Sequence, residues 1–119
     1  MQRRKFEVWE YTVSHAQLLL RSVRNEQHAT RVDVLFKNVG FVMLPTSLTI
    51  TAIEPVSAAD PLVERAKAEE VLRDGQTAFA LRSDEQDGLV VSGSMVSAED
   101  DREYHEPSSL PCWPMRSGE

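Results

Sequence analysis

This chain of 119 residues has few of the residues from which reactive sites are built. Its single cysteine, Cys112, cannot form an internal disulfide and fits a reducing compartment such as the cytoplasm. Its five glycines are isolated, which excludes a glycine-rich loop that binds phosphate. No segment approaches the roughly 20 consecutive apolar residues of a membrane-spanning helix. We therefore expect a cytoplasmic protein that does not enter a membrane and needs no cofactor.

Basic residues are also in the minority. Thirteen lysine and arginine residues accompany nineteen aspartate and glutamate residues, so the formal net charge is −6. Because nucleic acid binding requires a net basic face, we expect none. Residues 1–53 contain seven basic and four acidic residues, whereas residues 54–119 contain six and fifteen. Two interpretations stay open: an acidic surface that binds a partner, or neutralisation of one half of the chain by the other.

The N-terminal Arg3-Arg4-Lys5 is the most basic short segment. It is similar to the start of an export signal, but Glu7 and Glu10 interrupt the apolar stretch that such a signal requires. Three charges next to two glutamates are also a weak site for an anionic membrane surface. We expect neither secretion nor membrane binding.

Apolar and polar residues alternate along most of the chain before residue 54, as in half-buried antiparallel strands. This pattern, with a tight turn at Asn38 and Gly40, predicts strands at 6–13, 17–23, 31–37, 41–44 and 48–53. Two more strands are predicted at 76–83 and 89–97, where Gly93 is a candidate bulge.

One helix is predicted between the strands, over residues 61–73. Asp60 is its expected N-cap, Pro61 its first residue and Gly75 its stop. Its apolar stripe is narrow, so it should cover one side of the sheet. The pattern predicts an α+β fold with one helix on a mostly antiparallel meander of about six to seven strands, curved or partly closed as a barrel. A closed barrel is the alternative. We expect one compact domain over 1–97 and an acidic, then proline-rich tail over 98–119 that contains Cys112 and Trp113.

Two groups of residues are candidates for chemistry. Ser14 and His15 lie at a predicted strand end, with Asp33 or Glu10 as a third group of a nucleophilic site. Adjacent strand residues point to opposite faces, so we expect no bond between Ser14 and His15 and no catalytic residue. The candidate metal ligands match no recognised spacing, and we expect no metal site. They are His15, His28, His105, Cys112, Glu103 and Glu106.

Part of the sequence resembles a group of small, uncharacterised bacterial proteins. The resemblance lies in Trp9-Glu10, in SHAQLLLRS at 14–22 and in TRVDVLF at 30–36, and it continues weakly to about residue 105. No activity is assigned to that group. The resemblance therefore implies a compact bacterial protein of the cytoplasm and assigns no catalytic residue.

Two functions remain open. The first is a non-enzymatic interaction or accessory domain, an immunity-like or regulatory partner whose acidic face binds another, basic protein. The expected contact residues are Asp84, Glu85, Asp87, Glu99, Asp100, Asp101 and Glu103. The alternative is a small-molecule binding domain with a pocket near Trp9, Tyr11 and His15. Edge strands of an open sheet also make a homodimer possible, with the first or the last predicted strand as the joining edge.

Overall fold

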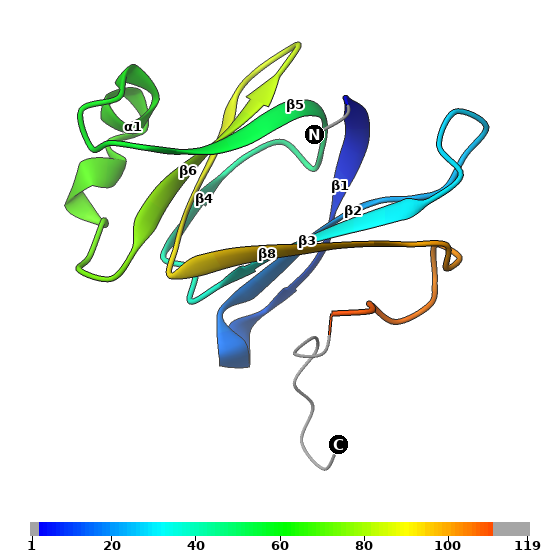
Figure 1. Cartoon of the computed structure of the whole chain (residues 1–119). Coiled ribbons are helices and arrows are strands. Elements are labelled where there is room, and N and C mark those ends of the chain that lie inside the picture. The colour runs from blue at the N-terminus through cyan, green and yellow to red at the C-terminus, as the bar shows by residue number, and fades with distance from the viewer. Residues whose placement is uncertain (1–2, 111–119) are drawn as a thin grey trace.

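The computed structural model describes residues 3–110, so the predictions for Cys112 and Trp113 lie outside the described residues. Strands, one α-helix and two short 3-10 helices follow one another along this part of the chain (Figure 1). In chain order they are β1 (Arg4–Thr12), η1 (Val13–His15), β2 (Gln17–Ser22), β3 (Arg31–Lys37), β4 (Phe41–Met43), β5 (Ser47–Val56), α1 (Pro61–Ala66), η2 (Ala68–Glu70), β6 (Thr77–Ser83), β7 (Gly88–Ser92) and β8 (Ser94–Asp100).

The strands form one antiparallel sheet of eight strands in the order β4-β7-β6-β5-β1-β2-β3-β8. β4 and β8 are its two ends and do not pair with each other within residues 3–110, so the sheet is not closed. β1–β3 and β5–β7 are each simple meanders, but β4 pairs with β7 and β8 pairs with β3. The predicted α+β fold with a mostly antiparallel sheet is confirmed. The predicted count of six to seven strands is wrong.

The additional strand results from a break at Gly93, inside the segment 89–97 that was predicted as one strand. The Gly93 N–H donates to the carbonyls of Lys37 at 2.8 Å and Asn38 at 3.1 Å. The chain thereby leaves β7, between β6 and β4, and joins β3 as β8. Asn38, at φ 55°, makes the matching bend between β3 and β4. The predicted turn at Asn38 is present, but the strands on either side of it are not paired with each other.

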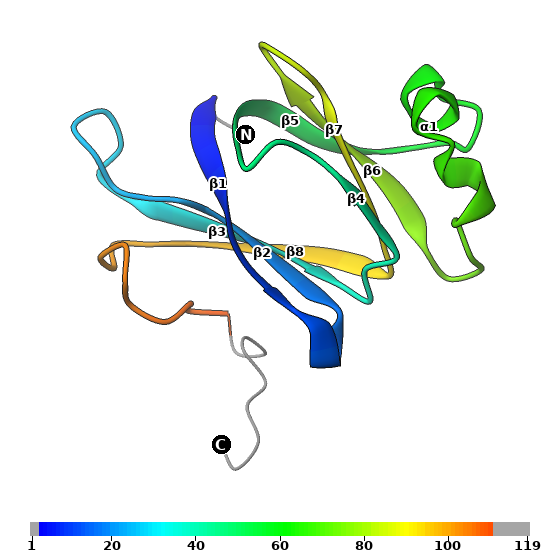
Figure 2. The ribbon, with the colours of Figure 1, turned by 180° about the vertical axis from the view of Figure 1, so that it is seen from behind.

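The sheet bends so strongly that one half, β1-β2-β3-β8, faces the other half, β5-β6-β7-β4 (Figures 1 and 2). Phe36 of β3 meets Phe79 of β6 edge to face, with ring centroids 5.8 Å apart, although β5, β1 and β2 separate these strands in the sheet. Burial of large apolar side chains, at about 1.5–3 kcal/mol each, stabilises this arrangement. The core residues are Phe6, Leu18, Leu20, Val34, Phe36, Leu48, Ile50, Leu81 and Val90.

The helix α1 begins as predicted and ends early. The Asp60 carboxylate accepts a hydrogen bond from the Leu62 N–H at 2.9 Å, and proline occupies the first turn. The predicted end at residue 73 is wrong, because Lys67 adopts φ 57° and ends the helix. Gly75, at φ 83°, instead lies just before β6. Neither α1 nor any other helix within residues 3–110 is long and apolar enough to cross a membrane.

The helix covers the outer face of β6 and β7 (Figure 1). Leu62 and Val63 of α1, with Ala68 of η2, pack on small and branched residues of these strands. The strand residues in this second cluster are Ala78, Ala80, Leu89 and Val91. The prediction that the helix covers one side of the sheet is therefore confirmed.

Residues 101–110, named the strap below, lie on the outer face of the other half of the sheet. They contain no helix or strand. Leu110 packs on Leu19 of β2 and Leu35 of β3, and this third cluster includes the partly buried Val96 and Ala98 of β8. β8 itself extends to Asp100, so the first three residues of the predicted tail belong to the sheet.

Candidate functional site

Arg31 on β3 holds the strap in place. Its side chain is completely buried, and its Nε and Nη2 donate to the two carboxylate oxygens of Asp100, each at 3.1 Å. Nη1 donates to the carbonyls of Glu103 at 2.8 Å and Glu106 at 2.7 Å, and Nη2 also donates to that of Pro107 at 3.0 Å. All five N–H donors of the guanidinium are thus satisfied.

Arg21 on β2 forms a second buried anchor. Its Nε and Nη2 donate to the two carboxylate oxygens of Asp33, at 2.7 and 3.1 Å, and Nη1 donates to the Tyr104 carbonyl at 2.8 Å. The guanidinium lies 5.0 Å from the centroid of the Trp9 ring, whose edge-to-face neighbour is Tyr104. Charge-assisted and cation–π contacts therefore fix the strap over Trp9.

Most of the acidic residues predicted to bind a partner have partners within the chain. Asp84 pairs with Arg3, Asp87 with Arg82, Asp100 with Arg31 and Glu103 with Arg24, and Glu99 accepts a hydrogen bond from the Thr30 hydroxyl. Within residues 3–110, the side chains of Glu85 and Asp101 have neither an ion pair nor a hydrogen bond. Three of these ion pairs join the basic half of the chain to the acidic half, whereas Arg82 and Asp87 both lie in the acidic half. The partner-binding role of all seven residues stays a prediction.

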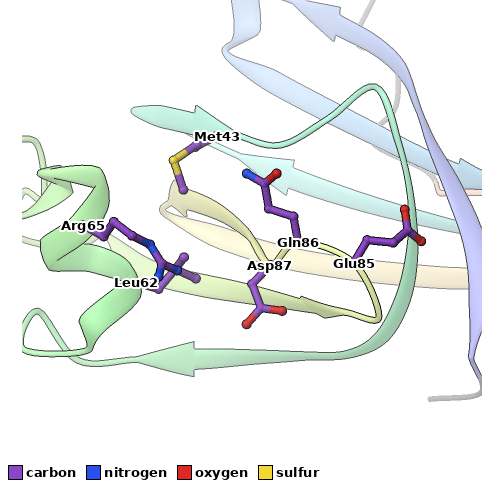
Figure 3. Close-up of a pocket in the computed structure, with 6 residues that line it drawn as sticks. All are labelled: Met43, Leu62, Arg65, Glu85, Gln86 and Asp87. Atoms are coloured by element: carbon purple, nitrogen blue, oxygen red, sulfur yellow. The ribbon is translucent and has the colours of Figure 1, made fainter.

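A pocket of about 590 Å³ opens between α1, β4 and the loop that joins β6 to β7. The helix contributes Leu62 and Arg65 from one side, and the loop contributes residues 85–87 from the other (Figure 3). The lining residues are Met43, Leu62, Arg65, Glu85, Gln86 and Asp87. Leu62 and Met43 belong to the apolar cluster beneath α1, so the pocket has an apolar wall and a polar rim.

The charge beside this pocket is predominantly negative. Arg82 donates to Glu54 at 2.8 Å and to Asp87 at 3.1 Å, and it lies 3.6 Å from Asp60. The hydrogen bond to Glu54, followed by that to Asp87, raises the pKa of Arg82. One guanidinium thus faces three carboxylates. Arg65 in the pocket wall offsets one of the two remaining negative charges, which leaves a surplus of one. The exposed Glu85 adds to this surplus.

A second pocket, of about 550 Å³, lies at the loop between β2 and β3. Asn25 shapes the loop, because its Oδ1 accepts hydrogen bonds from the N–H groups of Gln27 at 2.8 Å and His28 at 2.9 Å. The pocket brings His28 near Glu103, two of the candidate metal ligands. In the described part of the chain, no three His, Cys, Asp or Glu side chains are grouped as a metal site requires.

The prediction that Ser14 and His15 do not bond is wrong. They lie in the 3-10 helix η1 rather than on a strand, and Ser14 Oγ is 3.0 Å from His15 Nδ1. Both residues are exposed. Asp33 is buried against Arg21, and neither Asp33 nor Glu10 bonds the imidazole among residues 3–110. The pair therefore lacks the third group that orients a catalytic histidine.

The residues of the predicted small-molecule pocket line neither pocket described above. Trp9 is half-buried between Arg21 and Tyr104, Tyr11 is 45% exposed and His15 is exposed. A ligand site at these three residues stays a prediction.

The sequence interpretation missed two sets of residues. Arg21, Arg31 and Asp33 form the buried network, whereas the sequence suggested for Asp33 only a role beside Ser14 and His15. The available signal was charge at alternate positions 31 and 33 of β3 and an arginine directly after three leucines in β2. Met43, Leu62 and Arg65 line the larger pocket with the predicted Glu85 and Asp87. They come from separate segments of the chain, and no local pattern marks them.

Comparison with protein-family models, with curated proteins and with solved structures finds no match to this chain. The resemblance to the bacterial group therefore stays a prediction. In this chain the segments 14–22 and 30–36 contain the buried Arg21, Arg31 and Asp33.

Proposed function

We propose that this protein is a non-enzymatic interaction domain, an immunity-like or regulatory partner that binds a basic segment of another protein. The observation that carries this proposal is the pocket of Figure 3, where an apolar wall meets surplus negative charge. A lysine or arginine of the partner suits such a pocket. Its aliphatic stem would pack on Met43 and Leu62, and its charged head would lie beside Glu85 and Asp87.

The two carboxylates at the rim have different roles. Asp87 is held by Arg82 and accepts a hydrogen bond from the Ser83 N–H at 3.0 Å, so its position is fixed before a partner arrives. Glu85 is exposed and has no ion pair among residues 3–110. It can therefore bind a cation without first breaking a contact within the chain, which favours it as the principal contact residue.

The remaining acidic residues contribute to partner binding mainly through the long-range electrostatic field of the protein. Asp84, Glu99, Asp100 and Glu103 already have partners, and their charge adds to the net −6 of the chain. Such a net charge raises the rate at which a basic protein is encountered and loses its effect as salt is added. The single cysteine supports the cytoplasm as the place of this encounter.

The test uses Glu85→Lys and a matched control, Asp101→Lys. Both substitutions reverse the charge of an exposed side chain that has no ion pair in the described chain. Partners are captured from the host cell on the immobilised wild-type chain, and their affinities for each variant are then measured by calorimetry. Glu85→Lys should weaken binding about tenfold or more, and Asp101→Lys much less.

Two results would contradict the proposal. One is an equal loss of affinity in both variants, which would mean that only net charge matters. The other is unchanged binding in Glu85→Lys, which would remove the pocket from the interface.

A further inference from the structure

The two edges of the sheet differ in length. β4 has three residues and is followed closely by Pro45, so it offers little backbone for pairing. β8 has seven residues, none of which is buried, whereas every residue of β2 and β7 is buried. β1, one of the two predicted joining edges, lies inside the sheet between β5 and β2. The long open edge of the described chain is β8.

This edge lacks the features by which proteins usually prevent strand pairing. β8 contains no lysine, no proline and no bulge against β3. Its only charges, Glu99 and Asp100, lie at one end and are already engaged by Thr30 and Arg31. Residues 94–98 are uncharged. An unprotected edge of this length is a surface for strand addition.

We propose that β8 pairs with β8 of a second copy of this chain, antiparallel about a two-fold axis at Ser97. In this register Val96 lies opposite Ala98 of the second copy, and Met95 lies opposite its Glu99. Each pair occurs twice, because a two-fold interface uses the same surface of both subunits. This dimer does not depend on the proposed partner site. The pocket is lined by Met43 of β4, and β4 is the edge strand opposite β8 in the strand order.

Charge favours the antiparallel arrangement of two copies. Glu99 and Asp100 of one copy would lie beside the uncharged Met95 and Ser94 of the other. A parallel pairing in register would instead place Glu99 against Glu99 and Asp100 against Asp100, and like charges directly opposite are destabilising.

Apolar contacts favour the same register. Val96 and Ala98 are only partly buried and belong to the outer cluster with Leu19 and Leu35. Placing Val96 against Ala98 of the second copy would join the two outer clusters across the axis. The apolar surface of Val96 and Ala98 that is exposed in the monomer would then be removed from water, and this burial would stabilise the dimer.

The test measures the mass of the full chain in solution by sedimentation equilibrium, for the wild type and for Ser97→Lys. Ser97 is exposed, so this substitution leaves the fold intact, which circular dichroism verifies. It places two lysines opposite each other on the axis, and dimerisation should weaken about fivefold or more. A mixture of Ser97→Lys and Ser97→Glu should restore the dimer, because opposite charges then meet.

Val42→Lys on β4 is the control, because it adds the same charge to the other edge at a residue that is 41% exposed. It should leave the dimer unchanged. A wild-type chain that stays monomeric at high concentration would overturn the proposal. So would dissociation by Val42→Lys but not by Ser97→Lys, or failure of the complementary mixture to restore the dimer.

Discussion

Arg31 and Asp100 lie directly opposite each other on β3 and β8, and the guanidinium bonds both carboxylate oxygens of Asp100 at 3.1 Å. The remaining donors of Arg31 reach three carbonyls of the strap. One buried side chain therefore connects the last strand of the sheet to the segment that follows it. The strap is fixed mainly through its backbone carbonyls, which depend little on the identity of its side chains.

Replacing Arg31 with methionine should lower the free energy of unfolding by about 3–5 kcal/mol, the usual cost of breaking a buried ion pair by removing one partner. The loss arises because Asp100 and three strap carbonyls would lose their donor. Urea-induced unfolding measures it. Arg24→Met is the control, since Arg24 also bonds the strap but is 37% exposed, and it should cost no more than about 1 kcal/mol. Equal losses would show that burial of Arg31 is unimportant.

Stability should depend on pH through Asp100. Burial on its own raises the pKa of Asp100, but hydrogen bonds from the Arg102 N–H and from the side chains of Arg31 and Ser109 together outweigh it. The net result is a pKa below the usual value for aspartate. The folded chain therefore binds this proton less readily than the unfolded chain. The stabilisation is complete above the unfolded pKa of about 4 and is lost as the pH falls through the lowered folded value.

Unfolding free energies of the wild type and of Asp100→Asn, measured at a series of pH values, isolate this contribution. The wild type should be more stable at neutral pH, and the difference between the two proteins should shrink as the pH falls below about 4. A difference that stays constant over this range would mean that Asp100 does not stabilise the fold through its charge.

Much of the sheet could be predicted because alternation with a period of two is a local property of the sequence. The prediction for 31–37 coincides with β3, and Asp60 was recognised as an N-cap. The break at Gly93 could not be predicted in this way. It depends on hydrogen bonds to Lys37 and Asn38, more than fifty residues away in the chain.

In the candidate site, too, local features could be predicted from the sequence, whereas contacts between distant residues could not. The excess of acidic residues in the second half was visible, but which of them remain without a partner depends on arginines from distant strands, such as Arg31. Glu85 and Asp84 are adjacent in the sequence and looked equivalent. Only the fold places Arg3 next to Asp84 and leaves Glu85 at the pocket.

The Asp60 carboxylate has two contacts that can be separated by mutation. It caps α1 through the Leu62 N–H and lies 3.6 Å from Arg82. Asp60→Ala should lower the free energy of unfolding by about 1 kcal/mol through loss of the cap. Asp60→Asn should lower the free energy of unfolding by only a few tenths of the cost of Asp60→Ala, because asparagine also caps helices. Arg82 keeps its ion pairs with Glu54 and Asp87 in this variant. Thermal or urea unfolding compares the two, and an equal cost would assign the effect to the ion pair.

A side chain at Gly93, between β7 and β8, should destabilise the fold, because the space beside Asn38 is tight. A Cβ built there would lie 3.1 Å from the Cβ of Asn38, closer than ordinary van der Waals contact. Gly93→Ala should therefore lower the free energy of unfolding by about 1–2 kcal/mol through overpacking. At Gly40 the nearest atom is the Gln76 Nε2 at 3.0 Å, the end of a flexible side chain that can move, so Gly40→Ala should cost less.

A double-mutant cycle with Asn38→Gly tests whether this steric contact is the cause. Asn38 has φ 55°, which glycine adopts without strain, and its removal takes away the atom that crowds the new methyl group. In the Asn38→Gly background, Gly93→Ala should therefore cost clearly less than in the wild type, and urea unfolding gives the coupling energy. Strictly additive effects would mean that Gly93 is required for its backbone conformation rather than for the space beside Asn38.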